Sequence, residues 1–256
     1  MKMNNVDIIN AVKAGMKKSA SVTYLMNFSS GGQINTEYVA TVSIGLALVE
    51  SEFFHYDDEQ VIFEYSTGRF ISATVPVSKK SEPNKVFSKH IVRENVNTTR
   101  AGRIDIAILD SKSCFDKPKC AIEVKGDNPA KKLLFSDIRR NLEYFKHFGP
   151  TGKSDLKLAL NCSFQSYNVQ SQRSYCITTE HKKRKISSTK KRYQKYINEL
   201  KNEIPDGISV KIDVFTATSF LLEPNATQDE YESHMDSLHL TLGVVIIFER
   251  DVDCPT

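Results

Sequence analysis

Apolar residues recur with helical spacing in two segments near the start of the chain. Residues 5–17 form an amphipathic pattern that Asn5 can cap, and its apolar positions are Ile8, Ile9, Val12 and Met16. A second helix is predicted from Asn35 or Thr36 to about Glu50. Aliphatic residues occupy so much of its surface that we expect this helix to be buried.

Short runs rich in β-branched and aromatic residues predict strands. Residues 61–65 and 70–75 predict a hairpin that turns at Thr67 and Gly68. Further strands are predicted at residues 103–109, 120–125, 156–164, 208–216 and 238–248. The runs at 103–109 and 120–125 each have one fully apolar face, so we expect them to be central in a sheet.

Two later segments return to helical spacing. Residues 131–148 end at a Gly-Pro pair, and residues 187–203 form a basic helix that stops before Pro205. This alternation predicts an α/β fold with a central mixed β-sheet flanked by helices. No repeat or long linker divides the chain, which predicts a single domain over residues 1–256. Its core would span about 35–164, and residues 165–256 would add the basic helix and extra strands.

Length and composition narrow the class of protein. The 256 residues are 40% hydrophobic, enough for a large core, and no apolar run approaches the roughly 18 to 20 residues that span a bilayer. The first residues lack the continuous apolar segment of a secretory signal. Five cysteines, at 114, 120, 162, 176 and 254, form an odd set without paired short spacing. We therefore expect a cytoplasmic protein with reduced thiols and no membrane contact.

Charge is distributed unevenly. The net charge is +4, but residues 182–195 contain eight positive residues and no acidic one, leaving about −4 elsewhere. A solvated helix face would explain this run, and so would contact with a phosphate backbone. The candidate nucleic-acid-binding residues here are Lys182, Lys183, Arg184, Lys185, Lys190, Lys191 and Arg192. Tyr193 and Tyr196 are candidate stacking partners for bases.

Alternation along the two central strands brings charged residues to one face. Residues two apart in a strand share a face. On the first strand the charged face consists of Arg103, Asp105 and Ala107, and the apolar face of Ile104, Ile106 and Ile108. On the second strand the charged face consists of Ala121, Glu123 and Lys125, and the apolar face of Cys120, Ile122 and Val124. If the strands pair, Asp105, Glu123 and Lys125 converge. Two neighbouring carboxylates repel unless a cation lies between them, and Mg²⁺ or Mn²⁺ is the usual ion. A structural ion pair between Glu123 and Lys125 is the simpler alternative.

Asp105 followed by Glu123-Val124-Lys125 on a neighbouring strand resembles the PD-(D/E)XK nuclease superfamily. The order of elements over residues 35–164 is similar to the restriction-endonuclease-like core of that family. The resemblance implies that Asp105 and Glu123 bind Mg²⁺, for which Mn²⁺ substitutes, and that Lys125 positions the attacking water. It also implies an acidic residue on the preceding helix, where Glu37 is the first choice and Glu50 the alternative.

Other residues around these motifs extend the resemblance or depart from it. A helix with an acidic and a basic residue follows the Lys in restriction-type members, and Asp137 and Arg140 occupy such positions here. No Pro precedes Asp105, unlike the named pattern. Arg103 shares the charged face and is a candidate phosphate contact, or it neutralises Asp105. Asp110 and Asp127 flank the motif strands and could replace a ligand, although Asp in such places often serves a turn.

The resemblance implies a metal-dependent DNA endonuclease that hydrolyses phosphodiester bonds, acting in restriction or phage defence. Repair or junction processing, an RNase of the same architecture, and a catalytically silent nucleic-acid-binding subunit are the alternatives. DNA is the expected partner, together with a second copy of the chain in a homodimer, or a partner subunit. Two sites in a homodimer would suit double-strand cutting.

Overall fold

A computed structural model of the chain gives the positions of most of its residues. The part of the chain that it describes consists of residues 3–30, 34–76, 78–81, 89–92, 102–111, 117–149, 152–168, 179–223, 226–234 and 237–251. Cys114, Cys176 and Cys254 lie outside these residues, whereas Cys120 and Cys162 are buried free thiols.

A six-stranded mixed sheet organises the fold, with strand order β1-β4-β5-β8-β10-β9. The strands are β1 (Glu59–Ser66), β4 (Arg103–Asp110), β5 (Lys117–Asp127), β8 (Leu158–Asn168), β9 (Ile208–Phe220) and β10 (His239–Arg250). β5 and β8 are parallel, and every other neighbouring pair in this sheet is antiparallel. The predicted α/β fold class, a mixed sheet flanked by helices, is confirmed. Strands β4 and β5 have neighbours on both sides, as their apolar sequences predicted.

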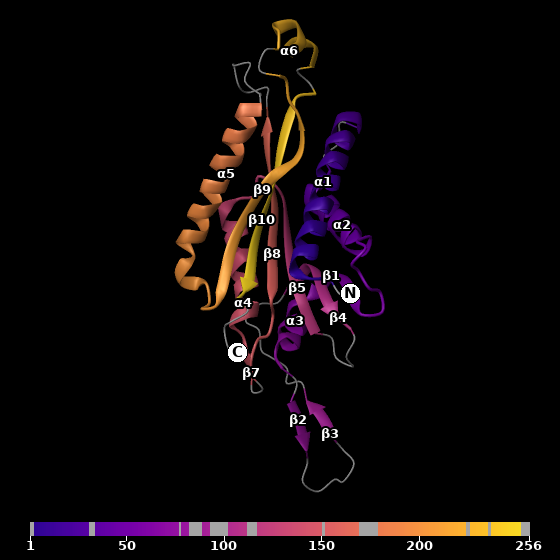
Figure 1. Cartoon of the computed structure of the whole chain (residues 1–256), viewed down its shortest axis with the longest axis vertical. Helices are drawn as coiled ribbons and strands as arrows, with labels where there is room; N and C mark the ends of the chain where they lie inside the picture. Colours follow the sequence, from indigo (N-terminus) through magenta and orange to yellow (C-terminus); the bar gives the residue numbers. More distant parts are fainter. Residues whose placement is uncertain are drawn as a thin grey trace.

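Helices cover both faces of this sheet (Figure 1). α1 (Asn5–Ser30) and α2 (Thr36–Val49) lie on one face, at the right of the view, and α5 (Thr179–Glu199) lies at the left. α3 (Thr67–Thr74) and α4 (Lys131–Lys146) share the face of α5, because their buried side chains belong to the same apolar cluster. The molecule therefore has three layers, with the sheet in the middle.

Each face of the sheet has its own apolar cluster. On the α1–α2 face, Ile44 of α2 packs with Ile122 and Val124 of β5. On the other face, Ile138 of α4 packs with Ala121 of β5. Side chains of this size gain about 1.5–3 kcal/mol each from full burial. The alternation of β5 between the two clusters is thus what anchors both helical layers to one strand.

Close contact between α1 and α2 depends on a small residue. A Cβ atom on Gly15 would lie 2.5 Å from the Cα of Ile44, so no larger residue fits without moving one helix. α1 continues to Ser30, well beyond the predicted end at residue 17. The longer helix brings Thr23 and Tyr24 alongside the sheet.

The remaining elements are small. They are the hairpin β2 (Ser78–Ser81) and β3 (Lys89–Val92), the pair β6 (Phe148–Gly149) and β7 (Gly152–Lys153), the 3₁₀ turn Lys201–Glu203, and α6 (Gln228–His234). The β2–β3 hairpin and α6 lie at opposite ends of the molecule (Figure 1). Among the described helices, none is long and apolar enough to cross a membrane.

The predicted hairpin of residues 61–65 and 70–75 is wrong in its second half. β1 forms as predicted, but residues 70–74 belong to the helix α3. Ser66 caps this helix, since its hydroxyl accepts the Arg69 N–H at 3.5 Å. Phe70, Ile71 and Thr74 are buried on one side of it, which is helical rather than strand spacing.

Candidate functional site

A β-bulge in β5 creates the position of Lys125. Val124 pairs with Cys162 of β8 and Asp127 pairs with Phe164, so one extra residue lies on β5 between these pairs. The start of α2 packs against the bulge. A Cβ atom on Gly126 would lie 2.4 Å from the Thr36 Oγ1 atom, and the Asp127 N–H donates to that oxygen at 3.3 Å. The glycine therefore allows the first turn of α2 to reach the end of β5.

This contact places Glu37 beside Lys125. The Asn35 side chain caps α2 by accepting the Tyr38 N–H at 3.1 Å, and Glu37 follows in the first turn. Lys125 Nζ donates to Glu37 Oε1 at 3.0 Å. Glu50 caps the opposite end of α2, about 20 Å along the helix axis, and lies 3.7 Å from Lys18. Of the two predicted helix acids, only Glu37 lies beside Lys125.

Asp105 is held where the pairing of β4 with β5 stops. The ladder runs from Ile106–Ile122 to Asp110–Lys117, and beyond it Asp105 Oδ2 accepts the Val124 N–H at 2.6 Å. The carboxylate thus replaces a strand hydrogen bond and lies beside the Glu-x-Lys segment. The other flanking acid, Asp110, is at the opposite end of β4.

The predicted alternation of β4 fails at Ile104. Ile106 and Ile108 pack on the α1–α2 face as expected, but Ile104 belongs to the cluster on the α4 face. On the neighbouring strand β1, Glu64 lies between the residues that pair with Ile104 and Ile106, and its φ of 52° interrupts the regular pleat of β1.

Two residues of α4 complete the cluster from the other face of the sheet. Arg140 Nη1 lies 3.0 Å from both carboxylate oxygens of the buried Glu123, and Asp137 Oδ2 lies 3.3 Å from Lys125 Nζ. Asp137 and Arg140 are three residues apart and so share a helix face, with their charged atoms 3.6 Å apart. Arg140 also donates to the Arg103 carbonyl at 3.4 Å, whereas Arg103 itself is exposed.

The cluster contains more acids than bases. Four carboxylates, those of Glu37, Asp105, Glu123 and Asp137, face the two cations Lys125 and Arg140. Burial raises the pKa of Asp105 to about 6, opposed by the Val124 N–H and by Lys125. Burial and the charge of Asp105 raise the pKa of Glu123 to about 8, although Arg140 opposes this. The arrangement favours uptake of a positive charge, either a proton or a metal cation.

Lys125 is held in its charged form. Burial lowers its pKa, but the neighbouring Asp137, Glu37 and Asp105 outweigh burial, so the net shift is upward. An ammonium group with a raised pKa does not remove protons at neutral pH. It can donate hydrogen bonds to a water molecule or to a phosphate oxygen, and Glu37 and Asp137 fix its direction.

The carboxylates fit a hard divalent cation by their chemistry, since Mg²⁺ and Mn²⁺ prefer oxygen ligands. Asp137 Oδ2 is buried and makes no hydrogen bond of acceptable geometry within the described structure, so it retains acceptor capacity. Within those same residues, no three His, Cys, Asp or Glu side chains are already grouped as a metal site. Binding by Asp105 and Glu123 would therefore require the Glu123–Arg140 contact to rearrange.

The predicted basic segment lies on α5, on the same face of the sheet as α4. Lys183, Arg184, Lys190, Lys191 and Arg192 are exposed there, and Lys182 and Lys185 are half-buried. Lys185 Nζ lies 4.5 Å from the ring centre of Tyr167 on β8. The run is therefore a largely solvated helix face, as both sequence interpretations require.

The suggestion that Tyr193 stacks on bases is wrong. Tyr193 is 1% exposed, and its hydroxyl lies 2.9 Å from Ser163 Oγ and 3.0 Å from Gln165 Nε2. It anchors α5 to the sheet instead. Tyr196 is half-buried and packs edge-on against Phe135 of α4.

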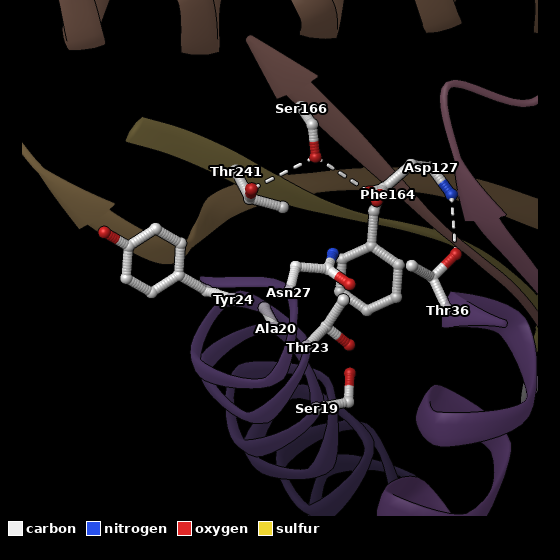
Figure 2. A pocket seen from close by; sticks show the side chains of 10 residues that line it. All are labelled: Ser19, Ala20, Thr23, Tyr24, Asn27, Thr36, Asp127, Phe164, Ser166 and Thr241. Atoms are coloured by element: carbon white, nitrogen blue, oxygen red, sulfur yellow. Dashed lines mark hydrogen bonds between the residues drawn. The ribbon is translucent and has the colours of Figure 1, made fainter. Parts of the chain in front are cut away.

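The structure also contains a cavity next to the cluster, which the sequence did not predict. It has a volume of about 230 Å³, and Figure 2 shows its lining side chains. They are Ser19, Ala20, Thr23, Tyr24, Asn27, Thr36, Asp127, Phe164, Ser166 and Thr241. These residues come from α1, α2, β5, β8 and β10, so no local motif predicts their meeting. Of these residues, the sequence indicates only Asp127 as a candidate ligand, for its place beside the Glu-x-Lys strand.

The chain matches none of the protein-family models, curated proteins or solved structures with which it was compared. Its resemblance to the PD-(D/E)XK superfamily therefore depends on the residues themselves.

Proposed function

We propose that this protein is a metal-dependent DNA endonuclease of the PD-(D/E)XK type. One observation carries the proposal: Asp105, Glu123 and Lys125, which lie on two strands, converge with Glu37 of α2 at a point with excess negative charge. A purely structural set would pair each buried carboxylate with a cation, because unpaired buried charge is costly. The two buried carboxylates have such partners, since Glu123 contacts Arg140 and Asp137 contacts Lys125. The half-buried Asp105 and Glu37 add negative charge beyond those pairs.

Each residue of the cluster has a role in this proposal. Asp105 and Glu123 would hold Mg²⁺ or Mn²⁺, which when bound lowers the pKa of a water and neutralises charge on the phosphate. Lys125 donates a hydrogen bond to the attacking water, and Glu37 orients Lys125 through their 3.0 Å contact. Arg140 contacts both Glu123 oxygens and would have to release them for Glu123 to hold a metal ion.

The basic face of α5 would bind the phosphate backbone, with Lys190, Lys191 and Arg192 as the exposed central residues. Lys182, Lys183, Arg184 and Lys185 extend that face toward the helix start, and Arg103 is an exposed cation next to Asp105. We place the activity in the cytoplasm, in restriction or phage defence. A homodimer would supply two sites for double-strand cutting.

A catalytically silent nucleic-acid-binding subunit of the same fold is the second candidate. The specific observation in its favour is Arg140 Nη1, which lies 3.0 Å from both Glu123 oxygens and so occupies the ligand atoms. Such a subunit would bind DNA in a salt-dependent manner and would be indifferent to divalent cations.

Cleavage of supercoiled plasmid tests the proposal. Purified protein is incubated with Mg²⁺, Mn²⁺ or EDTA, next to the variants Lys125→Ala and Lys157→Ala. Lys157 is an exposed lysine at the opposite end of β8, so its loss is a matched change of charge. We expect metal-dependent nicking by the wild type and Lys157→Ala, and a loss of at least about 100-fold in Lys125→Ala.

The outcomes separate the candidates. Absence of cleavage by folded wild-type protein with either metal, combined with salt-dependent DNA binding, would favour the silent subunit. Equal cleavage by wild type and Lys125→Ala would remove Lys125 from the mechanism. A DNA strand and an RNA strand of one sequence, each incubated with the protein, test the RNase alternative.

A further inference from the structure

The cavity beside the cluster has a buried interior and an exposed rim. Ser19 and Phe164 are buried at 1% and 3% exposure and form its floor, whereas Asn27 and Asp127 are exposed at its rim (Figure 2). Asn128 follows with a φ of 48° and donates its N–H to the Phe164 carbonyl at 2.9 Å.

The polar groups of the cavity select against anions. None of its ten described lining residues is Lys or Arg, and a phosphate would meet the Asp127 carboxylate. Asp127 Oδ1 accepts a hydrogen bond from Ser166 Oγ at 2.8 Å, and that hydroxyl lies 3.1 Å from Thr241 Oγ1. A carboxylate has two acceptor oxygens, so Asp127 could accept a further hydrogen bond from a ligand. A neutral ligand group that donates an N–H hydrogen bond would therefore complement this cavity.

The size of the cavity also restricts the ligand. A volume of about 230 Å³ equals roughly eight waters and falls below the roughly 300–1,000 Å³ of sites for drug-sized molecules. One planar heterocycle fits this range, with the Phe164 ring as an apolar surface beneath it. A whole nucleotide with its phosphates does not.

The cavity lies beside the part of the cluster that the start of α2 and the end of β5 contribute. Asp127 is two residues beyond Lys125, at most about 7 Å along the chain. Thr36, whose hydroxyl accepts the Asp127 N–H, immediately precedes Glu37. A phosphate at Lys125 and a base in the cavity would thus belong to the same or adjoining nucleotides.

We propose that this cavity receives one unstacked base of the bound strand and prefers bases with an exocyclic amino group, which donates to Asp127. The inference rests on the proposed function, because the phosphate at Lys125 places the base. Carboxylates accept hydrogen bonds from the cytosine amino group in known modes of base recognition, and extruded bases are recognised by such contacts together with stacking.

Fluorescence anisotropy with labelled oligo(dC) and oligo(dU) tests the preference. These strands differ at C4, where cytosine has an amino group and uracil has a carbonyl oxygen. EDTA prevents cleavage. We expect wild-type protein to bind oligo(dC) about tenfold more tightly. Asp127→Asn should abolish that ratio, since its amide offers N–H donors to uracil O4, whereas Asp206→Asn, the same change at an exposed turn, should retain it.

A second variant controls for an effect of the Asp127→Asn substitution on folding. Asn27→Leu places an apolar side chain at the exposed rim and should also reduce the ratio to about one. Equal wild-type affinity for both strands, or an oligo(dC) preference that survives Asp127→Asn and Asn27→Leu, would overturn the base site. Plasmid nicking would then decide the nuclease proposal separately, whereas failure to bind either strand or to nick plasmid would overturn both.

Discussion

Replacing Glu123 by Gln removes an ionisable carboxyl group from the cluster while keeping the shape of the side chain. Glu123 is 1% exposed, and its pKa is raised from the ordinary 4.5 to about 8 by burial and by the charge of Asp105. A folded protein that binds a proton more tightly than the unfolded chain loses stability as pH rises. The wild type should therefore weaken relative to Glu123→Gln between about pH 4.5 and 8.

The magnitude follows from the size of the shift. Each pKa unit corresponds to about 1.4 kcal/mol, so the difference in the free energy of unfolding should change by about 4 kcal/mol between pH 5 and pH 8.5. Near pH 5 the two proteins should be within about 1 kcal/mol, because both side chains are then mostly neutral in the folded state. At pH 8.5 the variant should be the more stable.

Urea unfolding in EDTA, followed by circular dichroism at pH 5, 7 and 8.5, measures this difference. Glu199→Gln is the matched control, since Glu199 pairs with Lys131 near the surface and should give a change under about 1 kcal/mol across the series. A wild type that gains stability over Glu123→Gln as pH rises would refute the reasoning. It would mean that the Arg140 pair dominates and that the cluster is a balanced structural network.

Three further changes test other parts of the structure. Gly126→Ala places a Cβ atom 2.4 Å from Thr36 Oγ1, so it should cost about 1–3 kcal/mol in urea unfolding and reduce plasmid nicking by displacing the start of α2. Tyr193→Phe removes a buried hydroxyl with two partners and should cost about 1–3 kcal/mol, yet leave DNA affinity by anisotropy unchanged. The double change of Lys190 and Lys191 to Ala should lower the slope of log affinity against log salt by up to about 1.8, with little effect on melting temperature.

Period-two alternation predicted the central strands and the meeting of Asp105, Glu123 and Lys125, although Ile104 of β4 departs from that alternation. Those segments are short, apolar and buried, so local pattern and tertiary environment agree. Residues 70–75 were misassigned because a short run of β-branched and aromatic residues fits a strand or one side of a short helix. In the structure, Ser66 caps the helix, and residues 67–74 are helical. The length of α1 was underestimated because its later turns mix polar and apolar residues.

Features that depend on contacts between distant segments could not be predicted. The bulge at Gly126 is recognisable only when β5 is aligned with β8, and it fixes which helix acid reaches Lys125. Asp137 and Arg140 were noted as positions on the following helix, but their contacts with Lys125 and Glu123 depend on how α4 docks. The burial of Tyr193 likewise depends on the packing of α5 against the sheet.

Lys125 contacts Glu37 from one helical layer and Asp137 from the other, and these residues are 100 positions apart in the chain. The charged centre therefore exists only while both layers are docked on the sheet. Local opening of either layer would disassemble it without global unfolding. A chain emerging from the ribosome would remain inert until residue 140 has been made and α4 has packed. The arrangement thus ties any activity of the centre to completion of the fold, which would limit damage by nascent or partly unfolded molecules.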